Sequence, residues 1–102
     1  MTPQFRLSKP AIQDVEQIAD QVARESGLIQ ADRFLNKLDA KFAKITRFPN
    51  LGRPRNEILP GLRSLPIDQY LILYMPIGQD VDILRVVSGY RDLVALFSNS
   101  ED

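Results

Sequence analysis

The sequence contains no cysteine and no histidine. Without cysteine there is no disulfide framework, and without histidine the commonest metal ligand and the commonest general base are both missing. Zinc sites, Ser/His/Asp triads and Cys/His dyads are therefore excluded, and we expect neither a metal site nor a cofactor. Long apolar runs are missing too, since none approaches the roughly 18 residues needed to cross a bilayer, and no basic segment followed by an apolar run opens the chain. We expect a cytoplasmic protein that does not enter a membrane.

What is present suits one small domain over residues 1–102. The hydrophobic fraction of 44% and the charged fraction of 25% are ordinary for a globular chain. The formal net charge is zero, but the charges are unevenly distributed. Between residues 44 and 63 the single acid Glu57 accompanies five cations, which are Lys44, Arg47, Arg53, Arg55 and Arg63. Such a patch suits phosphate groups or an acidic protein surface; alternatively, it is a solvated loop balanced by acids folded nearby.

Apolar periodicity predicts two consecutive amphipathic helices in the first half of the chain. The first runs from about residue 9 to residue 25, with Ser8 as its N-terminal cap and Gly27 beyond its end. The second ends at Phe48, because the residue before Pro49 is driven out of the helical region. The expected buried stripes are Ile12, Val15, Ile18, Ala19 and Val22 in the first helix and Ala31, Phe34, Leu35, Leu38, Phe42, Ile45 and Phe48 in the second, with Asp14 outside them. The two helices form a hairpin that needs a sheet to cover.

The second half of the chain predicts that sheet. Strands are expected over residues 62–66, 70–75 and 81–87, where β-branched, aromatic and leucine residues dominate, and residues 77–80 supply the turn between the last two. Pro66 places the first of these strands at an edge or ends it. Before them, residues 49–55 form an irregular basic loop in which Gly52 is free to adopt a positive φ.

Two shorter segments complete the layout. Residues 5–8 alternate apolar and polar side chains and predict a short strand. Residues 90–97 carry apolar surface for one or two helical turns, and residues 98–102 are polar and expected to fray. The fold class is therefore α+β, a small two-layer domain in which an N-terminal strand and an antiparallel helix hairpin precede an antiparallel sheet, in the order β-α-α-β-β-β with a short C-terminal helix.

Several segments, in this order, resemble the ParE branch of the RelE/ParE toxin superfamily. They are residues 7–11 (LSKPA), 14–18 (DVEQI), 48–55 (FPNLGRPR), 60–64 (PGLRS), 70–74 (YLILY) and 83–86 (ILRV). The likeness covers roughly residues 5–92. No single piece is diagnostic; their order and spacing carry the resemblance.

The resemblance implies a growth-arresting toxin of a type II toxin–antitoxin module, of the kind associated with plasmid stabilization. Its implied partner is a cognate antitoxin that covers the toxin surface with an extended or helical tail, giving a hetero-oligomer that meets DNA only through the antitoxin. RelE-branch members cut messenger RNA on the ribosome, whereas the ParE branch is known for poisoning DNA gyrase. A non-toxic member that only binds its antitoxin is a third alternative.

The chemistry of RNA cleavage separates the first two branches. Cleavage by this fold needs a base, a donor for the leaving oxygen and cations around the phosphate. In a ribonuclease, Arg63, Arg85 and Tyr90 would be the catalytic residues, with Arg55 assisting. Three features argue against this reading. Every lysine lies at or before residue 44, and the net charge is zero although phosphate contacts dominate the affinity of such proteins for RNA. In addition, Ser88 stands where many ParE-like chains carry a histidine. We therefore expect gyrase inhibition by protein–protein binding, with no catalytic residues.

The site residues follow from these expectations. The expected target-binding residues are Arg63, Arg85, Tyr90 and Arg91, with Arg53 and Arg55 at the rim, and the expected antitoxin-binding residues are Leu93, Leu96 and Phe97. Alternatively, Arg85 is a buried arginine paired with Asp92 or Asp68, because buried charges are paired, and the three apolar residues pack on the sheet. Tyr70 and Tyr74 share one strand face and are expected in or near the core, with hydroxyls that reach water.

Overall fold

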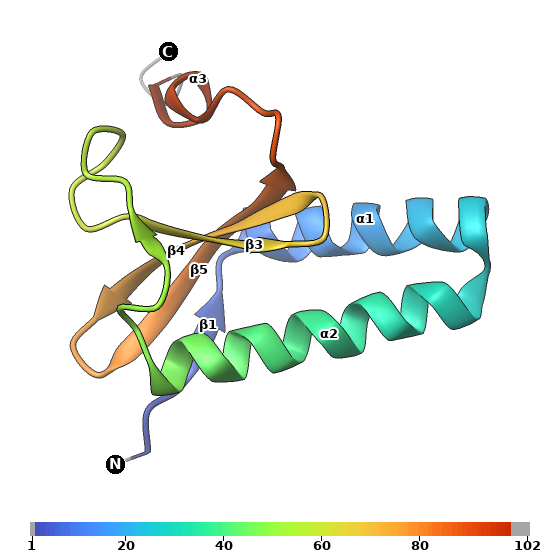
Figure 1. The fold of residues 1–102 in the computed structure, drawn as a ribbon, viewed down its shortest axis with the longest axis horizontal. Helices are drawn as coiled ribbons and strands as arrows, with labels where there is room; N and C mark the ends of the chain where they lie inside the picture. The colour runs from blue at the N-terminus through green and yellow to red at the C-terminus, as the bar shows by residue number, and fades with distance from the viewer. Residues whose placement is uncertain (1, 99–102) are drawn as a thin grey trace.

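The computed structural model describes residues 2–98, which form one sheet with helices on both of its faces (Figure 1). The elements, in chain order, are β1 (Phe5–Leu7), α1 (Lys9–Ser26), α2 (Leu28–Arg47), β2 (Arg53–Pro54), β3 (Arg63–Ile67), β4 (Tyr70–Ile77), β5 (Asp80–Ser88) and α3 (Leu93–Ser98). The α1–α2 hairpin covers one face of the sheet, and α3 lies over the opposite face. The predicted α+β class and the order of the predicted elements are confirmed, and the structure adds β2 to them. The fraying expected of residues 98–102 falls, apart from Ser98, outside the described residues.

The helices begin and end where the local chemistry predicts. The Ser8 hydroxyl accepts a hydrogen bond from the Ala11 N–H at 3.1 Å and caps α1, whose first turn contains Pro10. Gly27 separates the two helices with a φ of +94°, a value that side chains other than glycine rarely adopt. Helix α2 stops at Arg47, before the Phe48–Pro49 step. No helix among residues 2–98 is long and apolar enough to span a membrane.

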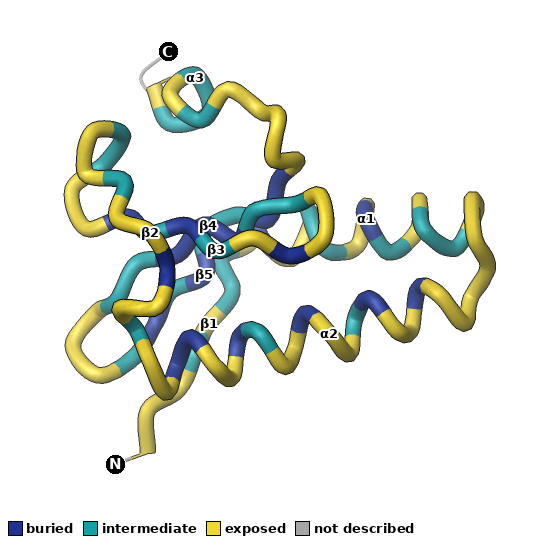
Figure 2. The backbone as a smooth tube through the Cα atoms, viewed as in Figure 1, coloured by how far each residue is buried: buried dark blue, intermediate teal, exposed yellow. Residues whose placement is uncertain are grey.

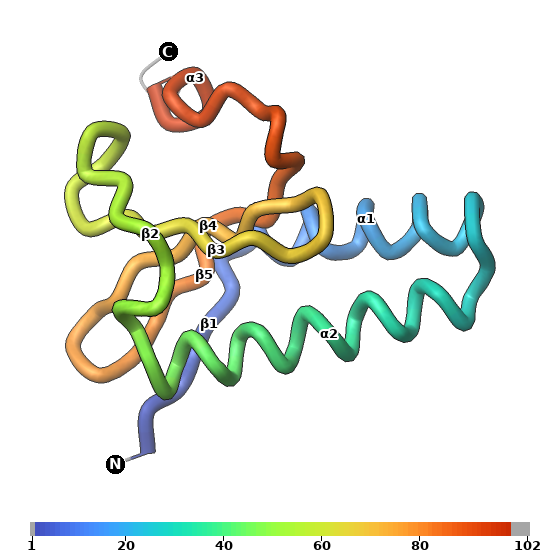
Figure 3. Tube along the Cα trace, in the orientation of Figure 1, coloured from blue at the N-terminus to red at the C-terminus, as the bar shows by residue number. Residues whose placement is uncertain are grey.

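The sheet contains the expected antiparallel strands and, in addition, β1, which pairs in parallel. Its order is β1-β5-β4-β3-β2, with β1 parallel to β5 and every other pair antiparallel. Figure 3 shows the start of the chain beside the orange last strand. A parallel pair needs a long crossover, which the helix hairpin and the strands after it provide. The three strands predicted from the second half of the chain are antiparallel as expected, and the parallel pairing of β1 was not predicted.

The basic loop contains a short strand that its composition does not predict. Arg53 pairs with Ser64 and Pro54 with Arg63, so the two-residue β2 extends the sheet at one edge. Strand β3 is covered by β2 only at Arg63 and Ser64. Pro66 lies where the outer side of β3 has no neighbouring strand, which agrees with the expected edge position of this proline.

The core is divided between the two sheet faces (Figure 2). The larger cluster fills the space between the sheet and the α1–α2 hairpin and contains the buried parts of both predicted stripes. The smaller cluster lies on the other face, where Leu62, Leu73 and Val87 are buried and the apolar side of α3 packs on them. A change of register between Leu73 and Tyr74 leaves Leu84 of β5 as an extra residue, a β-bulge.

Three predictions about buried side chains were wrong. Phe48 is 54% exposed, because it lies beyond the last turn of α2, where the Arg47 guanidinium stacks 5.6 Å from its ring centroid. Ile12 is also exposed, and Ala11 takes the buried position beside it. Tyr74 lies in the core as expected, but its hydroxyl bonds to the backbone rather than to water. Phe48 and Ile12 lie at the ends of their stripes, where helical periodicity no longer guarantees cover.

Candidate functional site

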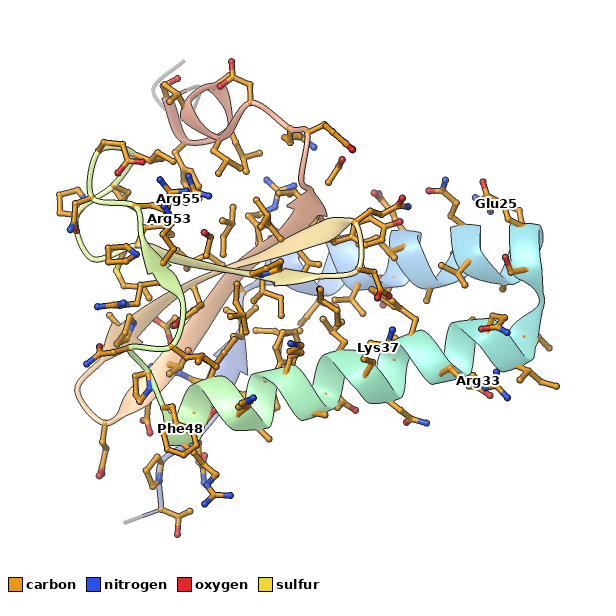
Figure 4. All side chains as sticks on the ribbon, in the orientation of Figure 1. Glu25, Arg33, Lys37, Phe48, Arg53 and Arg55 are labelled. Carbon is orange, nitrogen blue, oxygen red and sulfur yellow. The ribbon has the colours of Figure 1, made fainter. Side chains whose placement is uncertain are left out.

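The two rim arginines lie on and beside β2, in different environments. Arg53 is exposed, whereas Arg55 is half-buried and its Nε donates to the hydroxyl of the buried Ser64 at 2.9 Å. The Arg55 N–H also donates to the Leu62 carbonyl at 2.8 Å. Figure 4 shows both arginines beside the loop that follows β2, on the α3 side of the sheet. This edge therefore presents two cations, one of which is anchored.

Arg63 is half-buried and its guanidinium contacts the preceding loop. Its Nη1 donates to the carbonyls of Asn50 at 3.1 Å and Gly52 at 2.6 Å. Directly opposite Arg63 in the sheet lies Tyr74, whose hydroxyl donates to the Pro49 carbonyl and accepts from the Gly52 N–H, both at 2.7 Å. Burial raises the pKa of Tyr74, although the Gly52 N–H and the charge of Arg63 oppose the shift. Two neighbouring side chains of the sheet thus hold one loop.

Gly52 does not have the positive φ that was expected. In the described chain, the glycines with positive φ are Gly27, Gly61 and Gly78. Glycine is needed at position 52 because a Cβ there would lie 2.7 Å from the Tyr74 ring and hydroxyl and 2.9 Å from the Ser64 carbonyl. Close approach of the backbone to Tyr74, and not turn geometry, fixes the residue type.

Arg85 is paired, but not with either acid proposed from the sequence. Its Nε and Nη2 donate to the two carboxylate oxygens of Asp14 on α1, at 2.7 and 2.9 Å, and Asp14 also accepts the Val86 N–H at 3.0 Å. The hydrogen bonds that Arg85 donates to Asp14 raise the pKa of Arg85 further. Asp68 instead pairs with Lys37 at 2.8 Å, and Asp92 accepts the Ala95 N–H of α3. The pairing with Asp92 or Asp68 is thus overturned, and so is the placement of Asp14 outside the buried face.

Tyr90 and Arg91 are exposed in the segment that joins β5 to α3. The Tyr90 side chain is 95% exposed and borders a shallow surface cavity of about 210 Å³ beside the β3–β4 turn. The backbone N–H of Tyr90 donates to the Ser88 hydroxyl at 3.2 Å, and the Gly89 N–H donates to the Gln69 carbonyl. The backbone is thus tied to the end of the sheet, while the tyrosine ring is available to a partner.

The apolar side of α3 packs on the sheet, as one of the two alternatives proposed. Leu93, Leu96 and Phe97 are half-buried against the cluster of Leu62, Leu73 and Val87. Val94 on the same short helix is exposed. Helix α3 is thus a thin cover with apolar surface on both of its sides.

The structure keeps the three residues of the ribonuclease reading apart. Arg63 in β3 and Arg85 in β5 are separated by β4, and each guanidinium is engaged in a different direction, one on the loop and one on α1. Tyr90 lies beyond the end of β5. No group of three or more metal-ligating carboxylates occurs within residues 2–98. The arrangement offers binding surfaces rather than a converging set of reactive groups.

A cleft of about 620 Å³, not anticipated from the sequence, lies between the far ends of α1 and α2 and the β3–β4 turn. Figure 4 shows Glu25, Arg33 and Lys37 along the two helices that line it. Its cations and acids are equal in number, and Lys37 is paired with Asp68. The cleft therefore lacks the excess of positive charge that nucleic acid would require.

Sequence reasoning missed three residues that organise these surfaces, namely Asp14, Ser64 and Tyr74. For Asp14 a signal was present, because it lies three residues after Ala11 and four before Ile18 and therefore shares their helix face. For Ser64 and for the inward-pointing hydroxyl of Tyr74 there was none, because strand alternation gives a side chain's face but not its hydrogen-bond partner.

Comparison with known proteins places the chain among toxins. The model of the family described as ParE toxin of type II toxin–antitoxin system, parDE, matches residues 5–93. The chain is 33% identical over 88 residues to Toxin ParE3 of Caulobacter vibrioides, which covers 86% of this chain and 88% of that protein. It is 29% identical over 94 residues to Toxin ParE1 of Mycobacterium tuberculosis, covering 91% and 96%.

A solved structure has the same fold. The chain described as "Chromosomal ParDE TA system from P. aeruginosa" superposes with a TM-score of 0.73 at 19% identity, over 85% of this chain and 96% of that one. The helix hairpin on a five-stranded sheet is therefore an arrangement that this chain shares with a solved protein.

Proposed function

We propose, on the premise that this chain belongs to the ParE toxin family of type II toxin–antitoxin systems, that it acts by binding DNA gyrase and not by cleaving RNA. As a member of this family it is the toxin component, and its partner is an antitoxin. One observation carries the choice of mechanism: Arg63 and Arg85, which a ribonuclease would need in one site, each bind a different part of the fold. Without histidine there is also no ordinary general base.

The proposed target surface consists of residues around the sheet that are exposed, apart from the half-buried Arg55. Tyr90 and Arg91 form one part, and Arg53 and Arg55 form a second part at the β2 edge. Exposed tyrosine and arginine are the residue types most enriched at the energetic centres of protein interfaces. Arg63 binds the loop before β2, whereas Arg85 binds Asp14 on α1.

The proposed antitoxin surface is α3, with Leu93, Leu96 and Phe97 as its apolar residues. These side chains are only half-buried on the sheet, and Val94 beside them is exposed, so an antitoxin helix would bury the apolar area that remains. The surface lies next to Tyr90 and Arg91 in the chain. An antitoxin bound there would cover the neighbouring target surface, which accounts for neutralisation.

The test combines two assays on the purified chain. We expect inhibition of gyrase supercoiling, with intact message in an in vitro translation reaction. The double variant Tyr90→Ala/Arg91→Ala should lose inhibition, whereas Arg33→Ala, which removes an exposed arginine from α2, should keep it. Cut message with normal supercoiling would overturn the proposal in favour of RNA cleavage. Normal supercoiling, intact message and no growth arrest on expression would leave a member that only binds its antitoxin.

A further inference from the structure

Tyr74 is a buried titratable residue that neither proposed surface uses. It is fully buried in the larger core cluster, and its hydroxyl lies at the end of a ring that otherwise contacts apolar side chains. The hydroxyl both donates and accepts at 2.7 Å, to Pro49 and from Gly52. A buried hydroxyl is costly without partners, and phenylalanine would fill the same space. The presence of tyrosine at this position therefore calls for a role of the hydroxyl itself.

The partners of Tyr74 and of its cross-strand neighbour Arg63 form one continuous segment. Together the two side chains bind the carbonyls of Pro49, Asn50 and Gly52 and the N–H of Gly52. These are four of the seven backbone N–H and C=O groups of residues 49–52, the turn that leaves α2. Gly52 fits against Tyr74 so closely that no Cβ could be added. The turn is therefore held from inside the sheet, at four backbone atoms, by two side chains.

The fixed turn determines where the two rim arginines lie. Arg53 follows Gly52 directly and pairs with Ser64, and Arg55 two residues later is anchored to the Ser64 hydroxyl. Because β2 is only two residues long, its own ladder supplies little stability, and the turn before it must provide the rest.

We propose that Tyr74 and Arg63 form a clamp on residues 49–52 and act as positioning residues that hold Arg53 and Arg55 in place for the target. The proposal rests on the proposed function for its second half, because it assumes that the two rim arginines contact gyrase. It changes the role of Arg63, which serves the target through the loop and does not touch it. The first half, the clamp, concerns the chain alone and can be tested without gyrase.

The first experiment measures amide hydrogen exchange of the folded chain by NMR. Tyr74→Phe keeps the ring and removes the hydroxyl, and it should accelerate exchange of the Gly52 N–H by roughly tenfold to a hundredfold, the effect of losing one buried hydrogen bond. Tyr70→Phe is the matched control, because Tyr70 lies on the same strand face and its hydroxyl makes no hydrogen bond within the described chain. Unchanged exchange in Tyr74→Phe would overturn the clamp, whatever the chain does to gyrase.

The second experiment tests positioning with a double-mutant cycle on gyrase inhibition. Tyr74→Phe and the pair Arg53→Ala/Arg55→Ala should each weaken inhibition. The three substitutions together should inhibit no less than Arg53→Ala/Arg55→Ala, because a clamp that acts through the two rim arginines then has nothing left to position. Independent, additive losses would contradict the proposal, as would full inhibition by Arg53→Ala/Arg55→Ala. If the unmodified chain leaves gyrase active, the proposed function fails, while the exchange result still decides the clamp.

A charge-preserving substitution separates the two roles of Arg63. Lysine keeps the positive charge, but its side chain is one bond shorter than the path to Nη1, the single guanidinium nitrogen that donates to both carbonyls. We expect Arg63→Lys to accelerate amide hydrogen exchange in residues 49–52 and to weaken gyrase inhibition. Arg53→Lys should leave this exchange unchanged and gyrase inhibition almost unchanged. If Arg63→Lys behaved like Arg53→Lys, Arg63 would be an ordinary surface contact and the clamp would lose one of its members.

Discussion

The pairing of Asp14 with Arg85 should be the most sensitive electrostatic contact in the described fold. The Asp14 side chain is 12% exposed and the Arg85 side chain 23%, and the carboxylate accepts three hydrogen bonds, two from the guanidinium and one from Val86. Asp14→Ala would leave a largely buried cation and a backbone N–H without partners. Removing one partner of a buried pair costs about 3–5 kcal/mol, and we expect about 3 kcal/mol because Arg85 keeps some access to water.

The assay is equilibrium urea unfolding followed by circular dichroism, supported by thermal melting. For a domain of this size, a loss of about 3 kcal/mol lowers the melting temperature by roughly 12–24 °C. Lys37→Ala is the matched control. It removes a pair of nearly the same N···O distance, but its side chains are 53% and 46% exposed. Such surface pairs contribute less than about 1 kcal/mol.

A double-mutant cycle with Arg85→Met isolates the pair itself. Methionine keeps an unbranched apolar stem and removes the charge, so the combined variant no longer buries an unpaired guanidinium. The sum of the losses of unfolding free energy in the two single variants should therefore exceed the loss in the double variant by about 1.5–3 kcal/mol, the usual contribution of charged hydrogen bonds. If Asp14→Ala cost no more than Lys37→Ala, or if the two losses were additive, the contact would be a surface ion pair and our reasoning would be refuted.

Three further predictions concern the clamp and the core. Gly52→Ala should lower the free energy of unfolding by about 1–3 kcal/mol in urea titrations, because the new Cβ would meet the Tyr74 ring and the Ser64 carbonyl; an unaltered stability would mean that the loop can move away freely. Burial in the folded state raises the pKa of Tyr74. The protonated Tyr74 hydroxyl therefore contributes its full stabilisation below the unfolded pKa of about 10, and this contribution is lost as pH rises through the folded pKa. Above about pH 10, the urea midpoint should fall less with pH in Tyr74→Phe than in the parent chain. Phe48→Ala should cost less than about 1 kcal/mol, whereas Phe42→Ala, at a position 2% exposed, should cost about 3–5 kcal/mol; equal melting temperatures would contradict the assigned burial.

The parts of the fold that could be predicted are those set by neighbours in sequence. The limits of α1 and α2 were predicted to within a residue or two at Ser8, Gly27 and Phe48, because caps, glycine stops and the residue before proline act locally. The three long strands were predicted to within one or two residues for similar reasons. The predicted burial was wrong at the ends of the apolar stripes, at Ile12 and Phe48. Burial there requires another segment to cover the side chain, and helical periodicity does not show whether one does.

The parts that could not be predicted are contacts between distant segments. Nothing in residues 5–8 indicates that β1 lies parallel to β5, since a strand's partner depends on the path of the whole chain. Asp92 and Asp68 were plausible partners for Arg85 because they lie nearer in sequence, but the crossover places Asp14 beside it. The target and antitoxin surfaces remain proposals, because burial and exposure describe where a partner could bind and not which partner does.

The parallel pairing of β1 with β5 also determines at which point of synthesis the sheet can be completed. The first strand and the residues after it bond to partners 76 positions later, as Arg6 does to Asp82 and Ser8 to Leu84. A growing chain that has not yet added residues 80–88 lacks the central neighbour of β1 and β4, and long-range pairing of this kind forms late. A growing chain that ends before residue 80 therefore cannot complete the sheet that carries the proposed target and antitoxin surfaces.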